Sequence, residues 1–287
     1  MKALSIKLRL YIPLIKSLQT GLLLTTGLAG YMSAKCPVSN WTTLLSLAAS
    51  LFLAISGSTI LNMWYDRDID RRMKRTCKRP LASGEIRQNE ALGLGLLLSF
   101  LGVGWALMIL PLYGLIIFAG LFFDVVIYTI WLKRRTCWSI IWGGLSGGMP
   151  ILAGRALGLG AVDWIGILLA LSVLFWIPTH IMTFSLKYRT DYAAAGIPTF
   201  PSIYGVQFTR ANIVASSILA ALSIGLAAYG VGMTWGYLRM LIVLSAGLLT
   251  LAAGSIIRPS ERANFGLFKY ASLYMLSSML LLVMYGL

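Results

Sequence analysis

The sequence predicts an all-α protein, a polytopic bundle of membrane-spanning helices, and three observations lead to this fold class. Of the 287 residues, 58% are hydrophobic and only 11% are charged, and the mean hydropathy is +0.81. Because about a quarter of the residues in soluble domains are charged, this composition excludes an ordinary soluble enzyme, a disordered chain and a nucleic-acid-binding domain. Apolar segments recur along the chain, each long enough to cross a bilayer as a helix.

Nine apolar segments account for almost the whole chain. A helix is expected for each, because in lipid a spanning segment must pair its own backbone polar groups. No stretch between them is long enough for a soluble domain, so we expect residues 1–287 to form a single transmembrane domain. The predicted spans are 11–33, 41–63, 91–109, 112–131, 138–157, 164–186, 208–231, 236–257 and 267–285.

The basic residues fall on one side of this arrangement. The chain has 24 Lys and Arg against 9 Asp and Glu, a net charge of +15. If the N-terminus is cytoplasmic, 21 of the 24 are on the inside, and only Lys35, Arg155 and Arg239 are outside. Because cytoplasmic loops are enriched in Lys and Arg, we expect a cell-membrane protein with its N-terminus inside and its C-terminus outside. Residues 1–16 lack the continuous apolar core of a cleaved signal peptide.

The first candidate site lies at the cytoplasmic end of the second predicted span. Asn62, Asp66 and Asp70 are four residues apart, so on a helix they stack along nearly the same face. Asp68 is expected to face elsewhere. Like charges at this spacing repel, so either a cation or neighbouring basic residues should offset them. The basic run that follows contains Arg71, Arg72, Lys74, Arg75, Lys78 and Arg79.

This combination of acidic and basic residues has two interpretations. Mg²⁺ binds oxygen ligands and often uses one or two carboxylates together with a substrate phosphate, and Arg can contact phosphate through two hydrogen bonds. The pattern therefore favours a metal–diphosphate site. The alternative is a solvated helix end whose acids pair with nearby arginines, and spacing alone does not separate the two.

The second candidate site follows the sixth predicted span. Asp191 is the one acid of its cytoplasmic loop and could complete a metal site across the bundle. His180 is the single histidine of the chain, and ionisable residues inside a membrane span are functional candidates. A neutral histidine bonded to a neighbouring helix is the alternative. Asp124 and the aromatic residues Tyr128 and Trp176 lie in spans near the expected cavity.

Glycines four residues apart mark the fifth predicted span, between Gly143 and Gly154. Small residues at this spacing let helices approach closely. Room for a large flat ligand is the other interpretation.

These motifs resemble the UbiA-type intramembrane prenyltransferases. Asn62, Asp66 and Asp70 match the NxxxDxxxD motif of that superfamily, and the longer string from Asn62 to Leu81 is similar to its heme-farnesylating branch. Matching strings follow at 132–136, 143–154, 176–180 and 191–201. Asp124 departs from the pattern, and Lys187 occupies the first position of the second acidic motif.

The resemblance implies a UbiA-type fold and Mg²⁺-dependent transfer of a farnesyl group from farnesyl diphosphate to a vinyl group of heme B, with addition of water. It implies a product passed to a heme A synthase or a terminal oxidase. Implied catalytic and metal-binding residues are Asn62, Asp66, Asp70 and Asp191. Implied diphosphate contacts are Arg75, Arg79, Lys133, Arg134 and Lys187. Implied heme-binding residues are His180, Trp176 and Tyr128.

Two other functions remain open from the sequence. One is a UbiA-type enzyme acting on another lipid or aromatic acceptor, which the string from His180 to Pro201 disfavours. The other is a small transporter with an acidic site, and transporters carry such sites near the bilayer midplane. Here the polar residues are expected at the cytoplasmic edge, which favours chemistry at the membrane surface.

Overall fold

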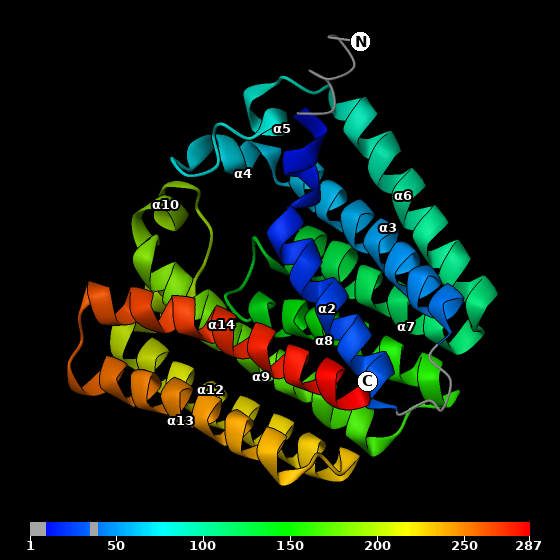
Figure 1. Cartoon of the computed structure of the whole chain (residues 1–287). Coiled ribbons are helices and arrows are strands. Elements are labelled where there is room, and N and C mark those ends of the chain that lie inside the picture. The colour runs from blue at the N-terminus through cyan, green and yellow to red at the C-terminus, as the bar shows by residue number, and fades with distance from the viewer. Residues whose placement is uncertain (1–9, 35–39) are drawn as a thin grey trace.

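The chain is an all-helical bundle in its computed structural model, which describes residues 10–34 and 40–287 (Figure 1). No strand occurs among these residues. The long elements are α2 (Ser17–Ser33), α3 (Trp41–Tyr65), α6 (Gln88–Ile109), α7 (Pro111–Phe122), the π-helix η1 (Phe123–Leu132), α8 (Ser139–Leu159), α9 (Trp164–Lys187), α12 (Gly205–Val231), α13 (Trp235–Ile257) and α14 (Glu261–Gly286).

Eight predicted spans coincide with these helices, with α7 and η1 together forming the fourth, whereas the first, 11–33, is interrupted at Lys16 and continues as α2. Within the described residues, seven helices are long and apolar enough to cross a membrane. The two others are α2, with 17 residues, and α8, whose glycines and Arg155 reduce its apolar character. The all-α prediction is confirmed, whereas nine membrane spans are not established. The extent of the single domain stays a prediction, and residues 1–9 lie outside the described part.

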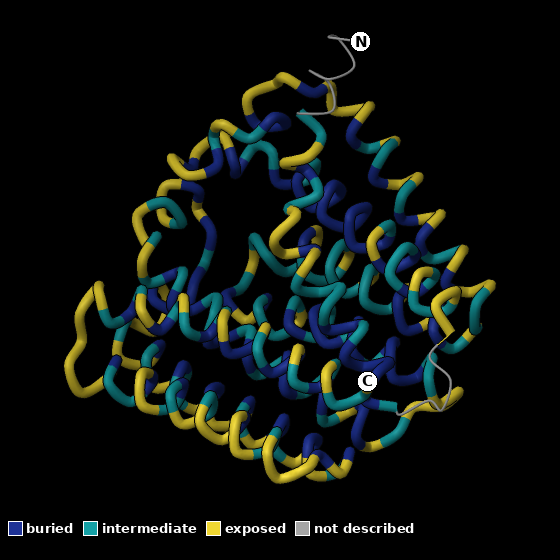
Figure 2. The backbone as a smooth tube through the Cα atoms, viewed as in Figure 1, coloured by how far each residue is buried: buried dark blue, intermediate teal, exposed yellow. Residues whose placement is uncertain are grey.

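Helices that follow one another in the chain pack side by side, and α2 closes the bundle. Each long helix from α6 to α14 packs on the next one in the chain, and α2 contacts α3, α8 and α14, which joins the two halves. Figure 2 shows the buried backbone concentrated in the middle of the bundle, with exposed positions along α6 and α13. Many exposed side chains are large and apolar, such as Phe100 and Val243. Such a surface suits contact with lipid tails.

Glycines bring α2 and α8 into backbone contact. A Cβ atom added to Gly154 would lie 1.9 Å from the carbonyl oxygen of Gly27, and one added to Gly30 would lie 2.0 Å from that of Ile151. Farther along α8, Gly148 packs against the carbonyl oxygen of Ala170 in α9. These positions support the close-packing interpretation of the glycine motif.

Short helices and loops gather at one end of the bundle, where α3 and α9 end (Figure 1). They are α4 (Arg67–Arg72), α5 (Pro80–Ser83), α10 (Arg189–Ala194) and α11 (Phe200–Ile203). A buried apolar cluster of Ile69, Met73, Ala195 and Ile197 joins the segment after α3 to the segment after α9. Two stretches more than 100 residues apart are thereby fixed beside each other.

Candidate active site

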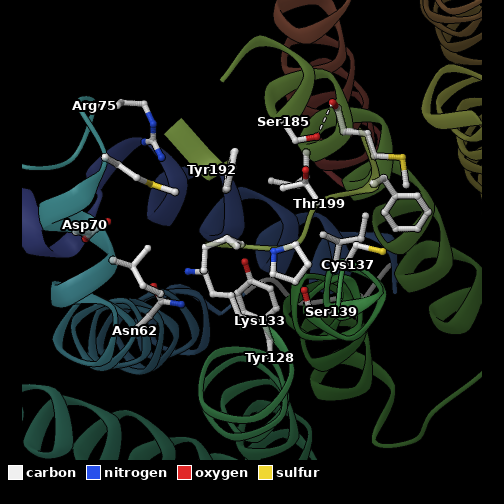
Figure 3. Close-up of a pocket in the computed structure, with 18 of the residues that line it drawn as sticks. Asn62, Asp70, Arg75, Tyr128, Lys133, Cys137, Ser139, Ser185, Tyr192 and Thr199 are labelled. Atoms are coloured by element: carbon white, nitrogen blue, oxygen red, sulfur yellow. Dashed lines mark hydrogen bonds between the residues drawn. The ribbon is translucent and has the colours of Figure 1, made fainter. Parts of the chain in front are cut away.

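A cavity of about 160 Å³ lies at this end of the bundle (Figure 3). Its walls come from the end of α3, from α4 and the following loop, from the junction of η1 with α8, and from the region between α9 and α11. Figure 3 shows Asn62 and Asp70 on one side of the cavity and Tyr128 and Lys133 on another. The polar side chains that line it are Lys16, Asn62, Asp70, Arg75, Arg79, Tyr128, Lys133, Ser139, Ser185, Tyr192 and Thr199.

The acidic motif keeps its helical spacing, although α3 ends just before Asp66. The amide of Asp66 donates to the carbonyl of Asn62 at 3.0 Å, and the amide of Asp70 donates to the carbonyl of Asp66 at 2.8 Å. All three side chains are buried: Asp66 is 2% exposed and Asp70 5%. These residues are therefore not a solvated helix end, although the other part of that alternative, pairing of an acid with a nearby arginine, is present for Asp70 and Arg79.

Each buried carboxylate is paired with a cation from another segment. Arg79 donates to both carboxylate oxygens of Asp70, at 2.8 and 3.1 Å. Lys133, at the end of η1, forms an ion pair with Asp66. The prediction that basic side chains or a metal offset the repulsion between the acids is met in this structure by Arg79 and Lys133. Asn62 instead donates to the hydroxyl of Thr129 at 2.7 Å.

One carboxylate oxygen suits a metal ligand. Oδ1 of Asp66 is buried and has no hydrogen-bond partner, and the nearest cationic nitrogen, on Arg134, is 4.0 Å away. A buried acceptor without a partner is costly, so this oxygen fits a bound cation. Within 10–34 and 40–287, however, no three His, Cys, Asp or Glu side chains are grouped as a metal site. The predicted set of Asp66, Asp70 and Asp191 is therefore not assembled here.

The carboxylate of Asp191 contacts the backbone of the basic loop. Its Oδ2 accepts a hydrogen bond from the amide of Arg75 at 3.4 Å. The guanidinium of Arg75 lies over the rings of Phe184 and Tyr188, at 4.8 and 5.6 Å from their centroids. Asp191 thus holds the loop that carries Arg75 rather than lining the cavity.

Three of the five predicted diphosphate contacts line the cavity, namely Arg75, Arg79 and Lys133. Arg134 follows Lys133 directly and turns away, donating to both oxygens of Asp68 at 2.7 and 2.8 Å. This hydrogen bonding lowers the pKa of Asp68 below its ordinary value. The side chains of Lys133 and Arg134 point in different directions, so the neighbour of a cavity residue in the sequence does not itself line the cavity.

Lys187 also points away from the cavity. Its ammonium lies 3.4 Å from the ring centroid of Phe265 in α14, and the residue is exposed. Lys187 therefore forms a cation–π contact with Phe265 in this structure and does not line the cavity.

The predicted acceptor residues are divided between two places. Tyr128 lines the cavity. His180 lies instead between two rings, stacked on Trp176 at 4.9 Å and on Phe268 at 4.4 Å, and its Nδ1 is 3.3 Å from the hydroxyl of Ser272. The indole of Trp176 donates to the carbonyl of Ala271 at 2.7 Å. The stack joins α9 to α14, and neither Trp176 nor His180 lines the cavity.

Two charged residues near the site, Asp124 and Lys16, were not among the predicted site residues. Asp124 begins the π-helix η1 and accepts a hydrogen bond from Ser58, and π-helical segments are frequent at functional sites. Lys16 precedes α2 and lines the cavity. The signal available in the sequence was that each is a charged residue inside an otherwise apolar span.

The chain belongs to the UbiA prenyltransferase family, whose profile matches residues 23–276. With the seven candidate spans, this membership establishes a multi-pass membrane protein and confirms the predicted enzyme class and fold. Its curated relatives include proteins named protoheme IX farnesyltransferase. That of Korarchaeum cryptofilum is 42% identical over 75% of this chain and 72% of the relative. That of Pyrobaculum neutrophilum is 38% identical over 91% and 94%.

Solved structures share the same fold. A digeranylgeranylglyceryl phosphate synthase superimposes with a TM-score of 0.80 and 20% identity, covering 98% of both chains. A UbiA homolog from Archaeoglobus fulgidus, solved with GPP and Mg²⁺, gives a TM-score of 0.70 and 16% identity over 96% of this chain and 99% of the other. At these identities the comparison concerns the fold alone.

Proposed function

We propose that this protein is a heme O synthase, a protoheme IX farnesyltransferase. It transfers the farnesyl group of farnesyl diphosphate to a vinyl group of heme B, adds one water, and releases heme O and diphosphate. The observation that carries the proposal is its similarity, over 91% of the chain, to a curated protein of that name. The cavity supports it, because cations beside an apolar bundle suit a substrate with an anionic head and a long apolar tail.

The metal proposed for this site is Mg²⁺, held by Asn62, Asp66, Asp70 and Asp191. The buried Oδ1 of Asp66 supports this choice, as does the family relationship to a protein solved with GPP and Mg²⁺. When bound, the metal would neutralise charge on the diphosphate and make it a better leaving group. Assembly of the four ligands requires Asp191 to approach Asp66 and Asp70.

The side chains of the cavity bind and orient the diphosphate in this proposal. Arg75, Arg79 and Lys133 donate to its oxygens, and such charge-assisted hydrogen bonds are strong in a low-dielectric site. If Asp66 and Asp70 bind the metal, Arg79 and Lys133 would donate to phosphate oxygens instead of to these carboxylates. Arg134 and Lys187, which face elsewhere, are left out of this set.

The apolar wall protects the reacting carbon. Ile140, Ile181 and Met182 line the cavity beside the polar residues, and they would exclude water until the vinyl group attacks the farnesyl carbon. Aromatic faces can stabilise a cation, and Tyr128 lines the cavity together with the rings of Tyr192 and Phe200. We assign the heme to the side of Trp176 and His180 in α9, where His180 directly precedes the lining residues Ile181 and Met182.

The orientation of the protein follows from its charge. We propose that the N-terminus and the cavity face the cytoplasm of a cell membrane and that the C-terminus is outside. The charge distribution supports this, since 21 of 24 basic residues then lie inside. The product would pass to a heme A synthase or to terminal oxidase assembly.

The deciding experiment incubates the purified protein in detergent with heme B, farnesyl diphosphate and Mg²⁺. We expect a farnesylated, hydrated heme by mass spectrometry, together with released diphosphate, and no product in EDTA. Diphosphate release with a lipid or aromatic acceptor, without any heme product, would support another UbiA-type reaction instead. No turnover with any acceptor would contradict a prenyltransferase.

The first variant for this assay is Asp66→Asn, which keeps the shape of the side chain and removes its charge. We expect product formation to fall by about 100-fold or more, as for loss of a group that stabilises the leaving charge. Asp68→Asn is the matched control, because the half-exposed side chain of Asp68 pairs with Arg134 and does not line the cavity. Equal activity of Asp66→Asn and the wild type would refute the assigned role of Asp66.

A further inference from the structure

The helix that enters the bundle is interrupted at Lys16, just before α2. Lys16 has φ 49° and ψ 59° and is the one non-glycine residue with positive φ within the described segments. The left-handed conformation is unfavourable for a residue with a Cβ atom. Such conformations persist where the surrounding structure enforces them, and they cluster at functional sites.

Neighbouring side chains stabilise the interruption. The carbonyl of Ile15 accepts a hydrogen bond from the hydroxyl of Thr20 at 2.6 Å, and the carbonyl of Leu14 accepts one from Thr59 of α3 at 3.3 Å. Leu14 itself is fully buried, in a cluster with Ile60. Polar contacts and apolar packing on both sides therefore hold Lys16 in its strained conformation.

The interruption brings the side chain of Lys16 to the cavity. Four cationic side chains line that cavity, and two of them are already paired, Arg79 with Asp70 and Lys133 with Asp66. Within residues 10–34 and 40–287, no ion pair involves Lys16 or Arg75. These two cations can meet an incoming anion without first giving up a carboxylate.

Lys16 lies among charges of both signs. Asp124 and Asp66 both interact with its ammonium electrostatically, and the cations Arg79 and Lys133 repel it. Asp124 is held by Ser58. The ammonium is thus kept among like charges, with only partial compensation, an arrangement that a polyanion would relieve.

We propose that Lys16 binds the diphosphate of the prenyl substrate, and that the left-handed turn persists because it directs this ammonium into the cavity. The proposal rests on the proposed function, because it assumes that the cavity receives a prenyl diphosphate. It adds a contact from the residue that precedes α2 to those from Arg75 and Arg79 of the basic loop.

The test measures binding of farnesyl diphosphate with Mg²⁺ to the purified full-length protein by titration calorimetry. Lys16→Met should weaken binding by about 10- to 100-fold, as for loss of a charge-assisted hydrogen bond, and Lys16→Arg should recover part of the affinity. Lys269→Met is the control: it removes the same charge from an exposed lysine of α14, whose ammonium lies over Phe265, and it should bind like the wild type.

Lys16→Gly separates binding from structure. Glycine adopts positive φ freely, so the melting temperature without ligand should equal or exceed that of the wild type while affinity falls as in Lys16→Met. Wild-type affinity in both variants would overturn the binding role, and a lower melting temperature in Lys16→Gly would overturn the role of strain. If the wild-type protein binds no prenyl diphosphate, the proposed function itself fails.

Discussion

Asp66 and Asp70 are buried acids whose cationic partners come from two different segments. Asp70 receives Arg79 from nine residues away, and Asp66 receives Lys133 from 67 residues away. Burying a charge is tolerated when a partner meets it, and removing that partner leaves an uncompensated charge. At the scale of single residues, the stability of the site therefore depends on the pairs rather than on the acids alone.

The pair of Lys133 and Asp66 leads to a stability prediction. Lys133→Met should lower the free energy of unfolding by about 3 kcal/mol, because it leaves the carboxylate of Asp66 buried and unpaired. Chemical denaturation in detergent measures this change. In the Asp66→Asn background the same substitution should cost much less, so an equal loss in both backgrounds would show that the pair is not the cause.

At the scale of elements, the contact between α2 and α8 fixes the first helix. Gly27 and Gly30 of α2 face Gly154 and Ile151 of α8 with no room for another carbon atom. Close backbone approach gains van der Waals contact, which is the main attraction between helices in lipid. This contact sets the position of α2 and thus of Lys16 at its start.

Gly154→Ala tests the contact. The added methyl group would lie 1.9 Å from the carbonyl oxygen of Gly27, and overpacking of this kind costs about 1–3 kcal/mol. We expect a lower melting temperature in detergent. Gly104→Ala is the control, since nothing lies within 4 Å of its added carbon; if both variants melt alike, the close approach does not stabilise the bundle.

At the scale of the whole molecule, the loops that the charge pattern assigns to the cytoplasm meet at one end. The cavity receives side chains from residues 69–79, 133–139 and 185–200. The basic residues therefore have two roles in our proposal, since those in loops orient the protein and a few of them bind the substrate.

This orientation predicts which loops a membrane-impermeant thiol reagent reaches. In a cysteine-free background and right-side-out vesicles, Ala161→Cys should be labelled, because the proposed topology puts the 160–163 loop outside. Lys74→Cys should be labelled only after the membrane is permeabilised. Both positions are exposed in the fold, so burial does not explain a difference. The reverse pattern would invert the proposed topology.

The sequence by itself determined the helices and the acidic motif, because both depend on local order. Apolar length predicts a helix in lipid, and four-residue spacing places Asn62, Asp66 and Asp70 on one face. It did not determine which cations meet them. Arg134 and Lys187 were predicted in the site and face elsewhere, whereas Lys16 gained no role. Only the tertiary structure decides such partners, since they depend on how distant segments pack and on where each backbone turns.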